Sequence, residues 1–316
     1  MKAVGNWIHI QGNTWCMALR VMIPVFLCGD GDAILLDSGY AEDRPELLRL
    51  LAEKNLRVRA VIGSHTHRDH CGNHAWLQSH CSAEIVMPQQ EAAFAASYGA
   101  LSAIYAPAGT ARLARLLPEM VFQADRTFTA GAESVEAGGV SFPLCGLPGH
   151  TPGHTGIMTP DRVLYTADAV LDEETLGHAK LLSIMDWEED ERSKERLGDI
   201  SADAYILAHG CVTDRLGDLI RRNHEVKRRQ AEEVSRWLRE RGPVTCSEAE
   251  RLVWDRLHLR SRNELTQAVY RRNLRCLLEY LTQTGALEAR FDGGTEIYIC
   301  YADQAYYEAH PVMYLT

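Results

Sequence analysis

Four side chains of the kind that bind transition metals lie close together in the first quarter of the chain. Residues 64–70, of sequence SHTHRDH, include His65, His67, Asp69 and His70. His65 and His67 are two residues apart, so in an extended segment both imidazoles project to the same side. Asp69 and His70 follow where the chain begins to turn, and they can point toward a second position close by. Imidazole and carboxylate are the usual ligands of a divalent ion such as zinc, so we expect a metal site here.

Three further candidate ligands, His150, Asp168 and His209, each come after a short apolar segment that predicts a strand. Open α/β sheets keep their sites where strands end, so these residues can meet the histidine segment at one edge. A single buried histidine is more often a hydrogen-bonded core residue than a ligand. Seven candidates at the ends of four predicted strands are difficult to explain as coincidence. By contrast, we expect His74 to lie at the surface or to face a helix, and His154 to orient a ligand or the substrate.

The elements that must position these residues follow an α/β pattern. Residues 21–36 predict a β-hairpin, residues 44–55 a helix, and residues 58–62 a strand that leads into the histidine segment. Further strands are predicted at 84–87, 140–144, 157–158, 163–165 and 205–207, and further helices at 73–79, 89–98 and 188–197. Residues 99–126 predict a helical insertion, which either covers the substrate or lies on the surface.

A change in charge near residue 215 predicts two domains, 1–215 and 216–316. Residues 1–214 carry a net charge of −12, residues 215–290 carry +6, and the remainder carries −4. Within the second domain, a long charged helix is predicted at 216–241. After it come predicted helices at 247–257 and 263–282 and a hairpin of strands 287–291 and 296–301, which is the order of a winged helix. The basic stretch could contact nucleic acid, although arginine-rich helix faces are more often simply solvated.

Composition excludes several other classes of protein. Of 316 residues, 46% are hydrophobic and 24% are charged, which is ordinary for a globular protein and excludes a collagen-like or wholly disordered chain. No run of 18 apolar residues is present, so we expect no membrane span. The nine cysteines include no C-x-x-C pair, which favours reduced thiols and a cytoplasmic location.

The ordered set of motifs resembles the metallo-β-lactamase superfamily. The set comprises the H-x-H-x-D-H run at 65–70, PGHT at 148–151, TAD at 166–168, AHG at 208–210 and an early DSG turn at 37–39. This resemblance implies an αββα sandwich with the metals at one edge. It places His65, His67 and His150 on one zinc ion and Asp69, His70 and His209 on the other, with Asp168 bridging the two and Asp37 supporting the site from behind.

The chain departs from the family pattern at three positions near the proposed ligands. Ala167 and Ala208 stand where many members have glycine, and Asn73 follows Gly72 where a second glycine is common. A methyl group beside a ligand is tolerable. These departures therefore weaken the inference that the chain shares the family's substrates more than the inference that it shares the family's metal site.

Two zinc ions that share a water molecule would bring its pKa toward ~7 and so supply a nucleophile at neutral pH. Asp69 is placed both to bind a metal and to orient that nucleophile, and Asp168 is the second candidate catalytic residue. Iron or manganese could occupy the same ligands, because affinity alone does not decide which metal is loaded in the cell.

Several substrates are compatible with such a centre. The Asp168 arrangement and the run at 149–154 are similar to glyoxalase II, which favours a small thioester or ester. Residues 216–300 resemble the winged helix of the lactamase-β-2-like branch, which includes a ribonuclease as well as proteins assigned as thioesterases and small-molecule hydrolases. A ribonuclease, or a hydrolase of lactones, β-lactams or phosphodiesters, therefore remains an alternative.

We interpret the predicted winged helix as a wall of the substrate cleft, and a homodimer through this domain as one possible assembly. Four aromatic residues, Trp7, Trp15, Tyr98 and Tyr105, could line a pocket, but aromatic side chains more often occupy the core.

Overall fold

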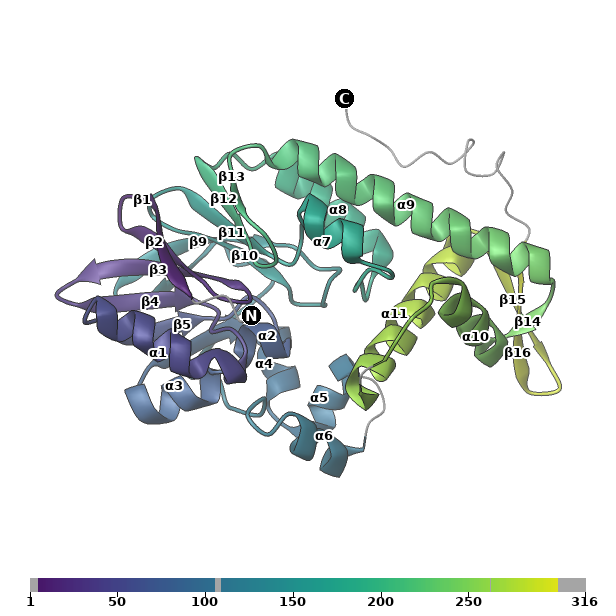
Figure 1. Cartoon of the computed structure of the whole chain (residues 1–316), viewed down its shortest axis with the longest axis horizontal. Coiled ribbons are helices and arrows are strands. Elements are labelled where there is room, and N and C mark those ends of the chain that lie inside the picture. The colour runs from purple at the N-terminus through teal and green to yellow at the C-terminus, as the bar shows by residue number, and fades with distance from the viewer. Residues whose placement is uncertain (1–4, 106–108, 262, 301–316) are drawn as a thin grey trace.

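Two β-sheets packed face to face form the main part of the structure, a computed structural model that describes residues 5–105, 109–261 and 263–300 (Figure 1). The first sheet contains, in spatial order, β1 (Asn6–Gln11), β2 (Thr14–Ala18), β3 (Met22–Gly29), β4 (Asp32–Leu36), β5 (Arg57–Ile62), β6 (Glu84–Pro88) and β7 (Arg126–Phe128). The second contains β13 (Val212–Thr213), β12 (Ala204–Leu207), β11 (Val163–Ala167), β10 (Thr155–Met158), β9 (Val140–Gly146) and β8 (Ser134–Ala137).

Strand β4 illustrates how the residues build these layers. Ile34 and Leu36 pack between the two sheets, whereas Ala33 and Leu35 join the core on the outer side of the first sheet. This alternation is the two-residue period of a strand that is buried on both faces. Strands β4 to β7 run parallel, as do β11 and β12, so their carboxyl ends lie at the same edge of each sheet.

Helices cover the outer faces of both sheets. The helices on the first sheet are α1 (Arg44–Glu53), α3 (His74–Cys81), α4 (Gln89–Ala95), α5 (Tyr98–Tyr105) and α6 (Thr110–Leu116). Leu197 of α8 (Trp187–Gly198) and Leu216 and Ile220 of α9 (Leu216–Arg241) pack on the second sheet. The arrangement is the predicted αββα sandwich.

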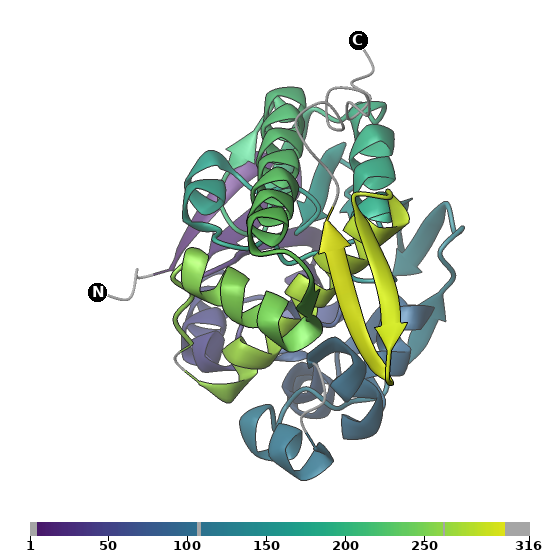
Figure 2. The same ribbon diagram turned by 90° about the vertical axis from the view of Figure 1, so that its right-hand side faces the viewer.

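The C-terminal elements add a third, smaller sheet. Helices α10 (Cys246–Arg256) and α11 (Glu264–Gln283) accompany the antiparallel strands β14 (Val244–Thr245), β16 (Thr295–Cys300) and β15 (Leu287–Asp292). Figure 2 shows the β15–β16 hairpin, in yellow, beside these helices. One apolar core joins α9, α10 and α11 to residues 176–187, a segment that begins inside α7 (Glu173–His178). The domain boundary at 215 stays a prediction, and Tyr301, which was predicted to end the hairpin, lies outside the described residues.

Most predicted elements are present, with shifted bounds. The helix predicted at 89–98 ends at Ala95, and α5 begins separately at Tyr98. Strands β1, β2, β7, β8 and β13 and helix α7 were not predicted. The residues of β1 are all exposed or half-buried, so this strand lacks the apolar pattern of a core strand. No helix in the described ranges is long and apolar enough to span a membrane.

Candidate metal centre

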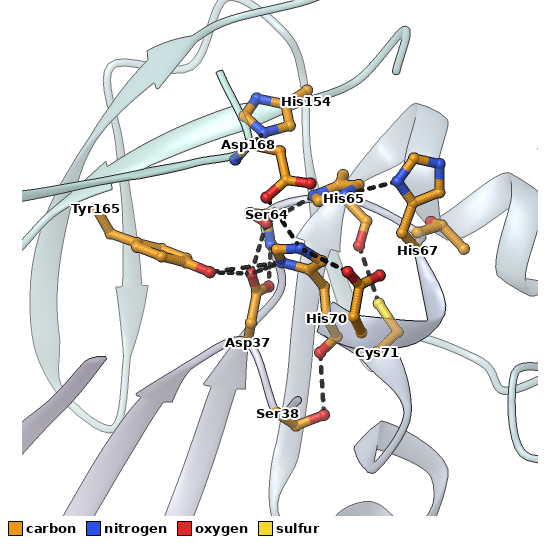
Figure 3. A network of polar contacts seen from close by, with 12 residues as sticks. Asp37, Ser38, Ser64, His65, His67, His70, Cys71, His154, Tyr165 and Asp168 are labelled. Carbon is orange, nitrogen blue, oxygen red and sulfur yellow. Dashed lines mark hydrogen bonds and ion pairs between the residues drawn. The ribbon is translucent and has the colours of Figure 1, made fainter. Parts of the chain in front are cut away.

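All seven predicted ligands meet at one edge of the sandwich. His65 and His67 lie in the loop after β5, and Asp69 and His70 lie on α2 (Arg68–Cys71), directly beyond it. From the second sheet, His150 comes from the loop between β9 and β10, Asp168 directly follows β11, and His209 follows β12. The metal centre therefore lies where two separate sheets end, as Figure 3 shows for the residues drawn there.

The seven side chains form two groups of four donors that share Asp168. The first group is His65, His67, His150 and Asp168; the second is Asp69, His70, Asp168 and His209. Within each group, one ligand atom from every residue lies within 4.8 Å of the others. This division matches the two metal positions that the sequence predicts, with Asp168 between them.

Distances inside the first group are those of side chains that converge on one point. His67 Nδ1 lies 3.0 Å from His65 Nε2 and 2.8 Å from His150 Nε2. His150 Nε2 is in turn 3.2 Å from Asp168 Oδ2.

The donor atoms of the second group also converge on one point. His209 Nε2 lies 3.0 Å from Asp69 Oδ2 and 3.5 Å from Asp168 Oδ2, and His70 Nε2 lies 3.2 Å from Asp168 Oδ1. His70 Nε2 and Asp168 Oδ1 are buried without a hydrogen-bond partner in the described part of the chain.

Asp37 orients His70 from behind the centre, as predicted. Its Oδ2 lies 2.6 Å from His70 Nδ1 and accepts hydrogen bonds from the hydroxyl groups of Ser64 (2.6 Å) and Tyr165 (2.8 Å). Its Oδ1 accepts a hydrogen bond from the Ser64 backbone N–H (2.7 Å). With its oxygens occupied, Asp37 holds the His70 ring so that Nε2 faces the centre.

Two contacts orient the ligands of the second sheet. His150 Nδ1 donates a hydrogen bond to the Ser183 carbonyl oxygen (2.7 Å), which directs Nε2 toward the centre. His154 Nε2 accepts a hydrogen bond from the Asp168 backbone N–H (3.2 Å), so His154 holds the segment that carries the shared carboxylate. The roles of His150 as a ligand and of His154 as a supporting residue stay predictions, and these contacts are compatible with both.

Glu91, on α4, links the two ligand loops and was not predicted. Its buried carboxylate accepts hydrogen bonds from the Thr66 backbone N–H (2.8 Å), the Thr151 hydroxyl (2.7 Å) and the Gly153 backbone N–H (2.8 Å). One side chain thus fixes the spacing between the loop of His65 and His67 and the loop of His150.

Burial and neighbouring charges shift the pKa values of the ligand residues in directions that favour the binding of a cation. Burial, reinforced by neighbouring imidazoles, lowers the pKa of His65 and His67, so both keep a neutral ring with a lone pair available for a metal. In the second group, Asp168 raises the pKa of His209 to about 10 against the opposing effect of burial, and Asp69 adds to the increase. The carboxylates of this group therefore stabilise a positive charge beside them.

These features fit a pair of divalent metal ions. Four tetrahedral donors at zinc–ligand bond lengths are separated from one another by about 3.3 Å, and the closest donor pairs here are 2.8–3.5 Å apart. Imidazole nitrogens face one another at hydrogen-bond distance, and a bound cation would remove the repulsion between their lone pairs. The donor set of nitrogen and carboxylate oxygen suits zinc, and also iron or manganese.

The structure shows the surroundings of two of the three positions at which the chain departs from the expected motif. Ala167 has a φ of +46°, a left-handed conformation that glycine adopts more readily, and it immediately precedes Asp168. Asn73 is buried, and its amide nitrogen donates to the carbonyl oxygens of Ser38 (2.7 Å) and Tyr40 (2.9 Å), so it ties down the turn after Asp37.

Predictions for residues around the centre were only partly right. His74 is completely buried, with Nδ1 2.7 Å from the Ser38 hydroxyl oxygen, so the expected surface position was wrong. Of the four aromatic candidates, Tyr105 lines a cavity at the centre. Trp7 and Trp15 instead pack against each other in the N-terminal hairpin, and Tyr98 donates to the Pro118 carbonyl oxygen.

A cavity of about 470 Å³ opens onto the metal centre. Its lining combines His67, His150, Asp168 and other centre residues with residues from the loop 179–184 and from helix α11. Helix α11 of the C-terminal region therefore lines the cavity, and Tyr105 shows that the insertion after α4 also contributes. Apolar groups such as Leu182, Ile184 and Val269 alternate with polar ones along this wall.

Comparisons with known proteins identify the relatives of this chain. The sequence profile of the family described as the metallo-beta-lactamase superfamily matches residues 23–209. Among curated proteins, hydroxyacylglutathione hydrolase GloC from Haemophilus influenzae is 28% identical over 140 residues. That alignment covers 44% of this chain and 61% of the relative, so less than two thirds of the relative is matched.

Two solved structures have the same fold over most of their length. A metallo-beta-lactamase family protein from Thermus thermophilus superposes with a TM-score of 0.66 at 20% identity, covering 89% of this chain and 93% of that one. A beta-lactamase domain protein from Burkholderia ambifaria gives the same TM-score at 16% identity, covering 95% of both chains. The likeness in fold therefore extends beyond residues 23–209.

Proposed function

The chain belongs to the metallo-β-lactamase superfamily, and on that premise we propose that it is a hydrolase of small thioesters or esters that works with two zinc ions. The observation that carries this proposal is the pair of four-donor groups that share Asp168 at the floor of a cavity. A cavity of about 470 Å³ has the size of a small-molecule site.

The ligand residues themselves account for the chemistry. His65, His67 and His150 would hold one ion, and Asp69, His70 and His209 the other, with Asp168 between them. When bound, the two ions would lower the pKa of water at the centre and polarise the scissile carbonyl group. The Asp69 carboxylate lines the cavity, where it can orient the attacking water and accept a proton from it. The apolar side chains of the wall, such as Leu182 and Val269, can pack against the acyl group.

Two observations favour a thioester over RNA. The matched relative is named as a hydrolase of hydroxyacylglutathione, in which the acyl group is joined to a thiol. On the C-terminal helices, Arg271 and Arg275 both pair with Glu250, and Arg256 pairs with Glu240. Arginines that are already paired with carboxylates offer less charge to a phosphate backbone. We also propose that α10, α11 and the third sheet form a winged helix that acts as the cavity wall.

The test is hydrolysis of a thioester panel by zinc-reconstituted protein. Acyl-CoA, acyl-glutathione and acyl-cysteamine compounds are compared with oxygen esters, and bound metal is counted by mass spectrometry. We expect two zinc ions per chain and turnover of at least one thioester. The variant Asp168→Ala should lose kcat/KM by a factor of about 10³ or more, because it removes the carboxylate shared by both groups.

Arg275→Gln, on the exposed side of α11, is the control and should retain turnover. Folded protein that holds two metal ions but hydrolyses no thioester or ester would contradict the proposal. Single-stranded RNA, lactones, β-lactams and phosphodiesters would then be assayed with the same preparation.

A further inference from the structure

Arg272 is a buried cation in the wall of the cavity. It lies on α11, its residue is only 8% exposed, and it lines the cavity together with His67, His150 and Asp168. A charged side chain that is removed from water is costly unless a charge of opposite sign lies beside it. The neighbours of the Arg272 guanidinium therefore indicate what the cavity binds.

The guanidinium contacts only neutral oxygen atoms. Its Nε and Nη2 donate to Asn273 Oδ1 (3.1 and 2.8 Å), Nη2 also donates to Ser183 Oγ (3.2 Å), and Nη1 donates to the Ile104 carbonyl oxygen. Within the described ranges, no carboxylate lies within ion-pair distance of it. Its charge is therefore uncompensated by the protein around it.

The other basic side chains of the cavity differ in this respect. Arg68 pairs with Glu42 at 2.6 Å. Lys194 pairs with Asp190, and Lys227 lies 3.2 Å from the same carboxylate and 3.8 Å from Glu191. The described lining thus contains several paired cations and one unpaired cation, Arg272.

Arg272 is also close to the reacting end of the cavity. Ser183 accepts a hydrogen bond from Arg272 through its hydroxyl oxygen and another from His150 Nδ1 through its carbonyl oxygen (2.7 Å). Ser183 therefore links the Arg272 guanidinium directly to His150, which is a predicted metal ligand.

Asn273 adds a second donor at the same place. It is buried, lines the cavity, and directs Oδ1 to Arg272, while its amide nitrogen has no hydrogen-bond partner among the residues that the structure describes. Nη1 of Arg272 has one N–H left, because its one acceptor in the described ranges is the Ile104 carbonyl oxygen. Together these groups can donate to a planar anion.

We propose that Arg272, with Asn273, binds a carboxylate of the substrate, so that the substrates are thioesters or esters with a carboxylate near the scissile bond. This inference rests on the proposed hydrolase function for its chemistry. A carboxylate at this position would pair with the buried guanidinium and would hold the scissile carbonyl group over the metal centre. Arg272 is thereby a specificity-determining residue supplied by the C-terminal region.

The kinetic test compares three thioesters, one with a carboxylate on the acyl part, one with a carboxylate on the thiol part and one with no carboxylate. Succinyl and butyryl thioesters of N-acetylcysteamine differ in the acyl part, and a butyryl thioester of 3-mercaptopropionate carries the charge on the thiol part. We expect wild-type protein to prefer one carboxylate-bearing substrate over the neutral one. Arg272→Gln should lose about 10- to 100-fold in kcat/KM for that substrate, mostly through KM, as expected for a charge-assisted hydrogen bond.

For the neutral thioester the same variant should lose less in kcat/KM than for the charged one, so the ratio of the two kcat/KM values should fall about tenfold or more. Arg272→Lys, which keeps the charge but loses the planar fork, should retain part of the preference. Arg275→Gln on the exposed face of α11 should retain all of it. An equal loss for charged and neutral substrates, or no preference in wild-type protein, would overturn the inference even where thioester turnover is found.

A binding measurement separates this inference from the proposed function. Glutarate and butyrate are titrated calorimetrically into metal-loaded wild-type protein, Arg272→Gln and Arg275→Gln. Both ligands offer one carboxylate to the metals, so the second carboxylate of glutarate reports on Arg272. We expect glutarate to bind about tenfold more tightly than butyrate, except in Arg272→Gln. That result without thioester turnover would overturn the proposed function alone, and equal binding of both ligands to wild-type protein would overturn the inference.

Discussion

His74 is a buried imidazole that belongs to neither donor group. Its Nδ1 contacts the Ser38 hydroxyl (2.7 Å), its ring packs near Phe122, and its Nε2 is buried without a partner in the described structure. Burial lowers the pKa of His74 from its ordinary value of 6.5 to about 4; the nearby Asp37 carboxylate opposes this shift, and His70 adds to it. The folded protein therefore keeps His74 neutral at pH values where the unfolded chain protonates it.

This difference predicts a loss of stability in acid. Between pH 6.5 and 4 the unfolded state binds more protons, so the free energy of unfolding falls as pH falls. From about pH 7 to about pH 5, His74 should contribute about 2 kcal/mol of that loss. Urea unfolding of metal-free wild-type protein and His74→Gln at both pH values measures it. The variant should show a pH dependence smaller by that amount, and an equal dependence in both proteins would contradict the pKa of His74.

Single residues show which parts of the site can be predicted from sequence. His65, His67 and Asp168 are recognisable because metal-binding types stand directly after predicted strands. Glu91 and Arg272 give no such signal, since each is one charged residue on an amphipathic helix. Their roles depend on burial and on partners far away in the chain, and a sequence without a structure shows neither.

At the scale of elements, the loop that carries His150 is held by the segment that leads into α8. The Gly149 carbonyl oxygen accepts hydrogen bonds from the backbone N–H groups of Met185 (2.8 Å) and Asp186 (3.0 Å), and Ser193 donates to the Pro148 carbonyl oxygen (2.6 Å). Gly149 has a φ of +132°, and a Cβ atom there would lie 2.4 Å from Asp190 backbone atoms. The loop and α8 can approach this closely only because the residue is glycine.

Gly149→Ala should therefore destabilise the fold by at least about 2 kcal/mol and displace His150. Chemical unfolding gives the stability, and zinc titration should show weaker binding at one of the two ions. Gly177→Ala, in α7 with open space around the glycine, is the matched control, and it should leave stability unchanged or raise it by up to about 1 kcal/mol. Similar stability losses in both variants would contradict the close packing at Gly149.

The elements themselves were predictable to different degrees. Strand β5 alternates exposed arginines with buried apolar residues and ends in Val61 and Ile62 at the metal loop, so its position follows from the residue pattern. Helix α11 was predicted almost to its ends because Asn263 caps it through the Thr266 backbone N–H (2.9 Å) and leucines repeat at helical spacing. Strand β1 was missed because it is stabilised mainly by its pairing with β2, which is not a local property of its sequence.

For the whole molecule, the metal centre joins two sheets that also meet through apolar packing and through polar contacts such as that between Tyr165 and Asp37. The first group takes His65 and His67 from the first sheet and His150 and Asp168 from the second. Metal ions bound here would cross-link the two layers and stabilise the folded state by mass action.

Removal of metal should therefore lower the thermal unfolding midpoint. At a free zinc concentration about 100 times the Kd, bound metal contributes about 2.7 kcal/mol, which corresponds to a shift of at least about 5 °C. Scanning calorimetry with and without a chelator measures the shift. Asp168→Ala should respond much less to the chelator, and a chelator effect of equal size in both proteins would place the stabilising metal elsewhere.

Helix α11 follows every predicted metal ligand in the chain, yet it lines the cavity that opens onto them. During synthesis the ligand-bearing strands leave the ribosome first, and N-terminal parts of a chain generally fold first. A nascent chain would thus present its metal centre to solvent before α11 covers it, so ions can load through an open face. Arg272 lies on α11 and is therefore synthesised after all seven predicted ligands. The chain would thus complete its metal centre before it contains the residue that we propose selects the substrate.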